Sequence, residues 1–341
     1  TISKMEISFL SMSRSPRKEN ANSKYNELNN KKVLYIGVST FGYELEIKKS
    51  MESMGATVDY YDERPSNTVF TKVLIRLKLK KLISLKIEKY YNKILSDIRN
   101  IKYDYIFIIK LETIDNIILE KLKESQKDAK FVLYLWDSIK NYKGKHELLP
   151  YFDKAFSFDS SDVKKYKGLI FLPLFYIPAY EKITKPEIKY DLCFIGSGHS
   201  DRYKIVSNIK RKSSELGLSV YCFLFLQSKI VFLFRKYFDK RMNNANIKEF
   251  SFFSLTQQEA IDIISQSNVV LDIEHPGQIG LTMRTIEMIG CEKKLITTNQ
   301  SIKDYDFYNE NNIYIMDRVD PEINKTFFLV PYQKLNNYIE N

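Results

Sequence analysis

The sequence contains little cysteine, histidine, glycine or proline, and each shortage excludes a class of protein. Its 341 residues include 3 Cys and 3 His, too few for a disulfide framework or a Cys/His metal cluster. With only 11 Gly and 9 Pro, the chain is neither collagen-like nor rich in linkers. The cysteines, Cys193, Cys222 and Cys291, lie among apolar residues, so we expect buried free thiols.

Long apolar segments are missing as well. The longest candidate, Val220 to Leu233, is interrupted by Gln227, Ser228 and Lys229 and falls short of the roughly 18 apolar residues of a membrane-spanning helix. The first residues also lack the basic and then apolar pattern of a secretory signal. We therefore expect a cytoplasmic protein in a reducing compartment.

The residues that are abundant describe a packed, basic protein. Hydrophobic residues make up 44% of the chain, charged residues 28% and aromatic residues 14%. The formal net charge is +11, which favours an anionic partner such as nucleic acid, a phosphorylated ligand or an acidic membrane surface. A codon-driven excess of Lys, Asn and Ile would give the same charge without a partner. At roughly 150 residues per domain, the length predicts two domains.

A short apolar run that ends in glycine opens each half of the sequence. Residues 32–37 have the composition of a buried parallel strand, and a helix is predicted over residues 43–54. The pattern restarts at residues 190–196, after a linker at 179–189 that contains Pro186. Such strand–loop–helix units build doubly wound sheets. The predicted fold class is α/β, with two Rossmann-like domains facing across a cleft.

The clearest functional signal is a strand, loop and helix over residues 271–290. Gly277 and Gly280 allow the backbone to approach a ligand, and the first N–H groups of the following helix can bind an anion. Arg284 lies in the first helical turn and can bind a phosphate through two N–H groups. Glu287, three residues later on the same face, can accept hydrogen bonds from a ribose. This order suits a nucleoside diphosphate; an ordinary turn with an Arg284–Glu287 ion pair is the alternative.

The segment 273–299 resembles the donor-binding core of GT-B glycosyltransferases, in particular the group-1-like and CgeB-like bacterial branch. The resemblance rests on Arg284-x-x-Glu287, followed by a small-residue turn at Gly290 and a strand over residues 295–298. It extends over about residues 190–300, whereas the first half matches only in layout. It implies that Glu287 binds the ribose of the nucleotide and that residues 277–282 hold the diphosphate.

The resemblance also has a departure that leaves the stereochemistry open. Many retaining members carry a second glutamate eight residues before the first, where this chain has Ile279, so Glu274 is a candidate replacement. The Gly196–Gly198 loop lacks the third glycine of a dinucleotide site; the resemblance implies that it faces the diphosphate and that Arg202 is a second phosphate contact. A tight turn with a surface arginine is the alternative. The predicted donor-site residues are Gly196, Ser197, Gly198, Arg202, Glu274, His275, Gly277, Gly280, Leu281, Thr282, Arg284 and Glu287.

A catalytic base for an inverting reaction is expected at a strand end of the first half, because ligands of parallel sheets bind there. Asp137, after a strand over residues 130–136, is the first candidate, although a helix N-cap is an equal reading. Glu112 is the second candidate. The predicted acceptor-side residues are Gly37, Thr40 and Trp136. No Asp-x-Asp pair follows a strand, so we predict no metal and no cofactor besides the nucleotide-sugar co-substrate.

Residues 72–93 form a basic stretch with interleaved leucines. Eight cations stand against one acid, Glu88, which predicts an interfacial helix on an anionic membrane; a solvated helix face is the alternative. The segment from Lys229 to Arg241 is a weaker example. The cations of residues 72–93 are Lys72, Arg76, Lys78, Lys80, Lys81, Lys86, Lys89 and Lys93.

Together these features predict a metal-independent glycosyltransferase that moves a sugar from a nucleotide-sugar donor to a glycan or lipid-linked acceptor. The resemblance places it in bacterial surface polysaccharide biosynthesis, in the cytoplasm or at the inner face of the cell membrane. One alternative is a nucleotide-sugar 2-epimerase on the same fold, which the shortage of histidine disfavours. The other is a basic nucleic-acid-binding protein, but no nucleic-acid module is recognised and we expect no such partner. The predicted segments are an extension over residues 1–30, an acceptor domain over 31–180, a donor domain over 190–315, and a segment over 316–341 that packs back toward the first domain.

Overall fold

The computed structural model describes residues 28–334, except 41, 69, 70, 72, 73, 76–79, 143, 182, 184 and 185. The predicted N-terminal extension therefore lies almost wholly outside the described residues, as does the end of the predicted C-terminal segment. The chain divides into two compact units, and the boundary lies between Leu174 and Phe175, a few residues before the predicted linker. Each unit is described by itself.

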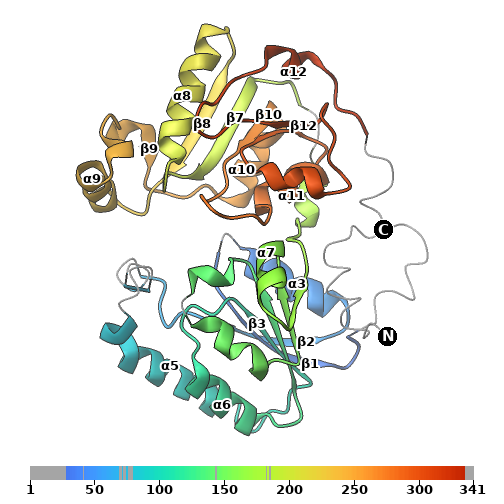
Figure 1. The fold of residues 1–341 in the computed structure, drawn as a ribbon. Coiled ribbons are helices and arrows are strands. Elements are labelled where there is room, and N and C mark those ends of the chain that lie inside the picture. Colours follow the sequence, from blue (N-terminus) through green and yellow to red (C-terminus); the bar gives the residue numbers. More distant parts are fainter. Residues whose placement is uncertain are drawn as a thin grey trace. The chain divides into compact units, whose positions relative to one another are not determined.

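The first unit is built on a six-stranded parallel sheet with the strand order β2-β1-β3-β4-β5-β6. Its core lies between the sheet and helices α5 and α6, which run side by side (Figure 1). The inner strands are almost entirely buried, as the apolar runs of the sequence predict for a sheet covered on both faces, whereas the two edge strands are partly exposed. The strands are β1 (Lys32–Gly37), β2 (Thr57–Asp62), β3 (Tyr105–Ile109), β4 (Lys130–Leu135), β5 (Lys154–Ser157) and β6 (Leu169–Phe171). The helices are α3 (Tyr43–Ser53), α5 (Ser84–Asp97), α6 (Asn116–Ser125) and α7 (Ser160–Lys165).

The second unit repeats this plan with the strand order β12-β11-β10-β7-β8-β9, again all parallel. Its core joins the sheet to helices such as α8 and to the aromatic side chains of α12. The strands are β7 (Tyr190–Ser197), β8 (Val220–Phe225), β9 (Phe250–Ser251), β10 (Ser267–Asp272), β11 (Lys294–Thr297) and β12 (Ile313–Ile315). The helices are α8 (Arg202–Glu215), α9 (Lys229–Phe238), α10 (Gln257–Ser265), α11 (Met283–Gly290) and α12 (Lys325–Leu329).

Strand order fixes where a ligand can bind in each unit. In the first sheet, β2 lies on one side of β1 and β3 on the other, so the strand order reverses between β1 and β3. In the second sheet the order reverses in the same way between β7 and β10. Ligands of such sheets bind outside the carboxyl ends of the strands at this switch point. The predicted Gly loop follows β7 and the predicted phosphate loop follows β10, so both lie at the switch point of the second sheet.

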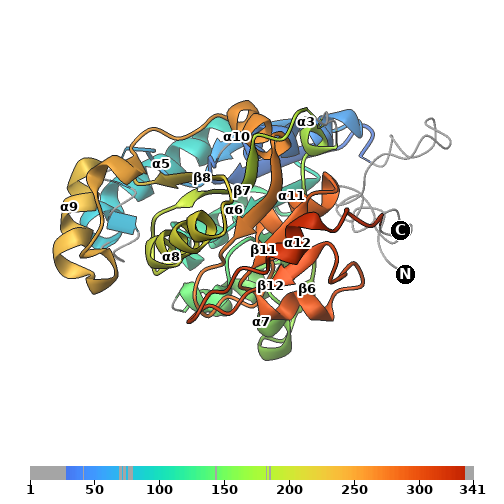
Figure 2. The same ribbon diagram turned by 90° about the horizontal axis from the view of Figure 1, so that it is seen from above.

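Short 3-10 helices connect several of these elements. They are η1 (Lys80–Ile83), η2 (Ile139–Asn141), η3 (Lys145–Tyr151), η4 (Pro178–Tyr180), η5 (Lys240–Met242), η6 (Ile247–Glu249) and η7 (Gln300–Asp304). Helix α9 lies at the outer end of its unit in both views (Figures 1 and 2). All three cysteines are free, with Cys193 buried and the other two half-buried. Among the described residues, no helix has the length and apolar character needed to cross a membrane.

Candidate functional site

Arg318, in the loop after β12, joins three loops at the carboxyl edge of the second sheet. Its Nε donates to Oδ2 of Asp201 and its Nη2 to Oδ1, each over 2.8 Å; Asp201 lies in the Gly loop. Its Nη1 donates to Glu274 Oε1 over 2.5 Å, and the hydroxyl of Thr298 donates to the other oxygen of Glu274. The loops after β7, β10, β11 and β12 therefore form one connected structure.

The carboxylates of this cluster differ in their proton affinity. Burial pushes the pKa of Asp201 upward, but the bonds from Arg318 outweigh it and hold the pKa below its usual range. Burial dominates at Glu274, whose side chain is only 8% exposed, and raises its pKa in spite of Thr298 and Arg318. Glu274, a predicted donor-site residue, is thus placed in an ion pair with Arg318.

Arg202, in the first turn of α8, connects the Gly loop to the predicted phosphate loop. Its Nε donates to the carbonyl oxygen of Ile273 over 2.7 Å, and its Nη1 lies 3.3 Å from Nε2 of His199. The rings of His199 and His275 are 5.7 Å apart. Burial lowers the pKa of Arg202, although Asp272 and Glu274 act in the opposite direction. The guanidinium therefore lies between the two loops and is not the surface side chain of the alternative reading.

The N-terminus of α11 is fixed by the carboxylate that ends β10. Thr282 is the N-cap and accepts a hydrogen bond from the N–H of Thr285 over 3.2 Å. The hydroxyls of Thr282 and Thr285 both donate to Asp272 Oδ2, over 2.5 and 2.7 Å. Helix α11 therefore begins at Met283, because Thr282 caps it from an extended conformation. Leu281, also predicted for the site, is buried.

Arg284 and Glu287 share one face of α11, as their spacing predicts, and bind each other there. Nη1 of Arg284 is 2.7 Å from Oε2 of Glu287 and 3.3 Å from the hydroxyl of Tyr180, in η4. The carboxylate is 2% exposed and the guanidinium 18%. Burial raises the pKa of Glu287 well above its usual range, and the neighbouring guanidinium opposes that rise. The pair is a buried one and not the surface ion pair of an ordinary turn.

The glycines of this edge serve two different purposes. Gly277 has a φ of 79°, in the left-handed region, and closes the turn between His275 and Gln278. At Gly198, by contrast, a Cβ would lie 2.6 Å from the ring of Phe250, so packing alone requires glycine there. Packing against Phe250 is therefore sufficient to explain the glycine at position 198 of the Gly loop. Gly280 is held in place because Asn299 and Gln278 donate to its carbonyl oxygen. The remaining Gly-loop residues of the prediction, Gly196 and Ser197, end β7.

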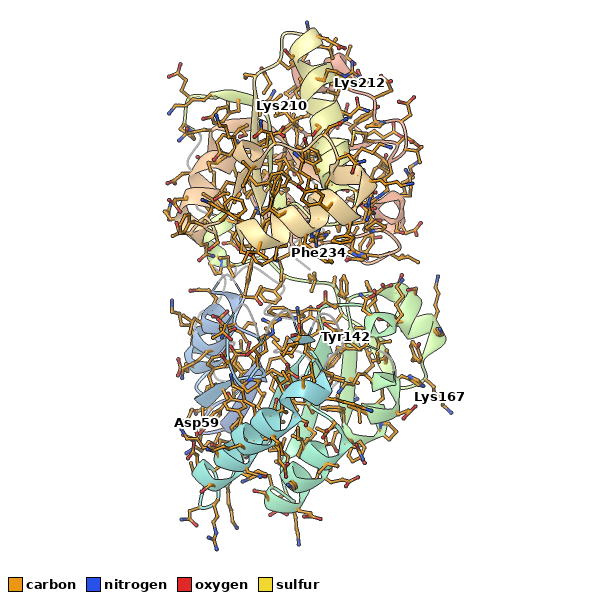
Figure 3. All side chains as sticks on the ribbon, turned by 90° about the vertical axis from the view of Figure 1, so that its left-hand side faces the viewer. Asp59, Tyr142, Lys167, Lys210, Lys212 and Phe234 are labelled. Carbon is orange, nitrogen blue, oxygen red and sulfur yellow. The ribbon has the colours of Figure 1, made fainter. Side chains whose placement is uncertain are left out.

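Charged side chains also line the carboxyl edge of the first sheet. Arg64, after β2, binds Glu112 through Nε and Nη2 over 2.6 and 2.8 Å. Lys110, after β3, binds Asp137 Oδ2 over 2.8 Å, and the hydroxyl of Tyr142 donates to the same oxygen over 2.9 Å (Tyr142 is labelled in Figure 3). Lys110 has a φ of 68°, which residues with a side chain rarely adopt. Strain of this kind at a strand end is typical of functional sites.

The two predicted acids of this edge are held in ionised form. Burial raises the pKa of Asp137, but Lys110 and Tyr142 more than compensate and lower it below its usual range. The pKa of Glu112 is lowered in the same way, with Arg64 and Lys110 outweighing burial. Asp137 is 38% exposed and is not a helix cap, because η2 begins after Ser138. Both acids can therefore accept a proton only weakly.

Glu63 is a third acid at this edge, and it is fully buried. Its Oε1 accepts hydrogen bonds from the backbone N–H groups of Thr113 and Ile114, over 2.5 and 3.0 Å. Its Oε2 is buried without a hydrogen-bond partner. Burial, with a contribution from Glu112, raises the pKa of Glu63 to about 7. Among the described acids at this edge of the first sheet, Glu63 is therefore the one whose pKa lies near neutral pH.

The predicted acceptor-side residues are placed at the same edge but are largely occupied. Trp136 is 9% exposed, and its ring meets Tyr43 and Tyr134 edge-on. Gly37 accepts a hydrogen bond from the hydroxyl of Tyr60 through its carbonyl oxygen, and the N–H of Thr40 donates to Glu44. Among the described residues, no group of three or more His, Cys, Asp or Glu side chains could hold a metal ion.

No protein-family model matches the chain, and no curated protein sequence matches it. Solved structures do. HepE from Anabaena, in complex with UDP-glucose, aligns with a TM-score of 0.55 and 11% identity over 84% of this chain and 86% of that chain. The catalytic domain of starch synthase IV from Arabidopsis thaliana, bound to ADP and acarbose, aligns at 0.53 with 10% identity over 88% and 90%. The UDP-forming α,α-trehalose-phosphate synthase from Burkholderia xenovorans aligns at 0.55 with 9% identity over 85% and 89%. The chain has a GT-B fold.

Within this GT-B fold, the two predicted loops of the second unit lie at the carboxyl edge of its sheet, but the residue that connects them, Arg318, was not predicted. Arg318 lies in a loop with no motif of its own, and its partners Asp201 and Glu274 are 117 and 44 residues away. In the first unit, Arg64 and Lys110 were missed as well. Both follow strands of the first sheet, a position that they share with many residues that have no role in a site.

Proposed function

We propose that this GT-B protein is a glycosyltransferase that transfers a sugar from a nucleotide-sugar donor to a glycan or lipid-linked acceptor. The observation that carries the proposal is the buried Arg284–Glu287 pair on the first turn of α11, at the switch point of the second sheet. Three arginines, Arg202, Arg284 and Arg318, gather at this edge. Complexes of similar folds support the nucleotide class, because HepE was solved with UDP-glucose and the starch synthase with ADP.

The donor would bind with its ribose at Glu287 and its diphosphate at the start of α11. The first N–H groups of an α-helix have no partner within the helix, and its positive dipole end favours an anion. Arg284 has five N–H donors and uses Nη1 for both Glu287 and Tyr180, so its guanidinium can also meet a phosphate. Arg202 would supply a second cation from the Gly loop. These groups stabilise the negative charge that develops on the departing diphosphate.

The acceptor would bind at the carboxyl edge of the first sheet. Its hydroxyl oxygen attacks the anomeric carbon, the bond from that carbon to the phosphate oxygen breaks, and the electron pair leaves with the diphosphate. In an inverting reaction the hydroxyl proton passes to a base, for which Asp137 is the first candidate and Glu112 the second. Asp137 is ionised beside Lys110, so its carboxylate is free of a proton at neutral pH, but its lowered pKa makes it a weak base that accepts the proton only as the bond to the diphosphate breaks. We assign no metal to this step.

The resemblance to the CgeB-like branch supports a role in bacterial surface polysaccharide assembly. A membrane contact through residues 72–93 remains part of the proposal, although residues 72, 73 and 76–79 and the side chain of Lys80 lie outside the described residues. In the described part, Leu82 and Leu85 are 72% and 80% exposed, whereas Ile83 and Ile87 belong to the core. Some of the interleaved apolar residues are therefore available to a partner.

Calorimetric titration with a panel of nucleoside diphosphates and nucleosides tests the donor site. We expect Arg284→Met to weaken diphosphate binding by about 1.5–3 kcal/mol, the strength of a charge-assisted bond, and to leave nucleoside binding nearly intact. Glu287→Gln should weaken both. The double variant Arg284→Met with Glu287→Gln removes the whole pair, and its affinity for nucleosides should resemble that of Glu287→Gln.

A matched control is the exposed Arg211–Glu215 pair on α8, also 2.7 Å apart. Arg211→Met should leave every affinity unchanged. Unaltered diphosphate affinity in both Arg284→Met and Glu287→Gln would refute the donor site. An epimerase on this fold would convert the donor without an acceptor, so product analysis of a reaction lacking acceptor separates the two activities.

A further inference from the structure

Helix α9 turns its apolar face toward solvent. Apolar residues recur at the i, i+3, i+4, i+7 and i+8 spacing that normally marks the core-facing stripe of a helix. Phe234 is labelled on this helix in Figure 3. The stripe residues Ile230, Leu233, Phe234, Tyr237 and Phe238 are 78%, 48%, 63%, 81% and 76% exposed. We call these five residues the α9 stripe.

The opposite side of α9 fixes this orientation. Phe232 is 2% exposed and packs against Phe250 of β9, with ring centres 5.3 Å apart. Arg235 donates from Nη1 to the carbonyl oxygen of Gly198 over 3.3 Å. Ser228 caps the helix by accepting a hydrogen bond from the backbone N–H of Val231. The helix is thus anchored through its inner side, and the α9 stripe cannot turn into the core without breaking these contacts.

Cations surround the α9 stripe. Residues 229–248 contain six basic residues and one acid, Asp239, which is already bound by Arg241 over 2.7 Å. Lys229, at the start of the helix, is exposed, whereas Lys236 is half-buried and donates to the carbonyl oxygen of Ala245 over 2.9 Å. Lys240 and Lys248 are exposed. An apolar face rich in aromatic residues with basic flanks is the composition of helices that lie in the plane of a membrane surface.

We propose that the α9 stripe and its flanking cations form a docking surface for an anionic lipid bilayer. The stripe enters the boundary between headgroups and acyl chains, and Lys229, Lys240 and their neighbours meet lipid phosphates. A second copy of the chain is a poorer occupant, because a symmetric contact would bring two such basic segments together. The surface differs from residues 72–93 and lies in the other unit. The proposed membrane contact of α9 does not depend on the proposed glycosyltransferase function, although it would bring a glycosyltransferase to a lipid-linked acceptor.

Flotation of the full chain with lipid vesicles tests the surface. We expect binding to vesicles of phosphatidylcholine mixed with phosphatidylglycerol, weakening as salt rises, and much weaker binding to phosphatidylcholine alone. Lys229→Gln with Lys240→Gln should lower the partition coefficient about fivefold for each cation, hence about 25-fold. Phe234→Ser with Phe238→Ser should lower it at least about 100-fold, because each buried aromatic side chain contributes about tenfold or more. The matched controls, Lys303→Gln and Val319→Ser, change exposed residues elsewhere in the unit and should have no effect.

A fluorescent probe in the stripe shows which surface is buried. The indole introduced by Tyr237→Trp should shift its emission to the blue and be quenched by brominated lipid, whereas the native Trp136, which is 9% exposed, should not respond in the unsubstituted chain. Three results would overturn the proposal. The first is the absence of flotation at low salt. The second is flotation that leaves the Tyr237→Trp probe unresponsive and is lost in the double variant Lys81→Glu with Lys86→Glu. The third is a doubling of the molar mass in solution that the double variant Phe234→Ser with Phe238→Ser abolishes.

Discussion

Replacing Arg318 by methionine should destabilise the second unit by about 2–4 kcal/mol. The guanidinium neutralises Asp201 through two contacts of 2.8 Å and Glu274 through one of 2.5 Å. Methionine keeps most of the apolar stem but removes the guanidinium that contacts both carboxylates, and leaves Arg202 as the nearby cation. Breaking a buried ion pair costs about 3–5 kcal/mol, and we reduce this figure because Arg318 and Asp201 are 21% and 22% exposed.

Thermal unfolding measures the effect, and its pH dependence identifies the cause. At about 2–4 °C per kcal/mol, the melting temperature should fall by about 5–15 °C near neutral pH. Arg318 depresses the folded-state pKa of Asp201, so its contribution is present above the unfolded pKa and is lost as pH falls through the depressed value. In Arg318→Met, Asp201 and Glu274 take up protons at higher pH. The difference between variant and wild type should therefore shrink as pH falls, from the pH at which the carboxylates of the variant take up protons down to the depressed pKa of Asp201 in the wild type.

Two further variants make this prediction decisive. Arg211→Met breaks an exposed pair whose side chains are 62% and 59% exposed, and should cost less than about 1 kcal/mol. Asp201→Asn combined with Arg318→Met should cost less than the sum of the single variants, because the two side chains share one interaction. The reasoning is refuted if Arg318→Met costs no more than Arg211→Met, or if its cost is the same at every pH.

Three other predictions follow from single side chains. Glu63→Gln should remove a pH dependence. The raised pKa of about 7 means that the wild type loses stability as pH rises from about 4 to about 7. The variant should therefore gain up to ~3 kcal/mol over the wild type at pH 8 and almost nothing at pH 4, as urea unfolding at both pH values would measure. Gly290→Ala should cost about 1–3 kcal/mol, because the new Cβ would lie 2.7 Å from the ring of Tyr176; Tyr176→Leu in the same chain should restore most of the loss, and a full cost that persists there would contradict the packing argument. Lys110→Met should raise the pKa of Asp137 and move the acidic limb of the transferase pH–rate profile to higher pH, whereas an unmoved limb would remove Asp137 as the base.

The fold was predictable because its signal is local. Residues 33–36 and 192–195 are short apolar runs of the kind that a strand buried on both faces contains, and each is followed by a helix. The sheets of both units are confirmed as parallel and doubly wound. Helix limits differ from the prediction. The helix expected over residues 72–93 is α5, which begins at Ser84 after η1 and ends at Asp97, and residues 72, 73 and 76–79 lie outside the described residues.

The site was predictable only where it follows the chain closely. Arg284 and Glu287 are three residues apart, so their common face follows from helical geometry alone, and the structure confirms their contact. Gly198 illustrates the opposite case. Its sequence neighbours suggest a ligand-binding loop, whereas its contact with Phe250, 52 residues away, is a packing requirement that no local pattern contains. Ion pairs such as Arg64–Glu112 are equally invisible, because they are set by strand order.

The carboxyl edge of the second sheet, where we propose the donor site, carries almost balanced charges. Burial raises the pKa of two of its acids, Glu274 and Glu287, and so brings their neutral forms closer to physiological pH. The neutral forms matter because a diphosphate would otherwise approach more negative than positive side chains. The cations are Arg202, Arg284 and Arg318, and the acids are Asp201, Asp272, Glu274 and Glu287.

Binding of a nucleoside diphosphate at this edge should therefore take up protons. The new negative charge raises the pKa of Glu287 and Glu274 further, so affinity should increase as pH falls, by at most about tenfold per pH unit for each proton taken up. Calorimetry in buffers of different ionisation enthalpy measures the proton uptake directly. Glu287→Gln is neutral at every pH and should lower the uptake, while Arg211→Met should leave it unchanged. A diphosphate that binds without proton uptake would show that the protonation of these acids does not change on binding, and would refute this coupling.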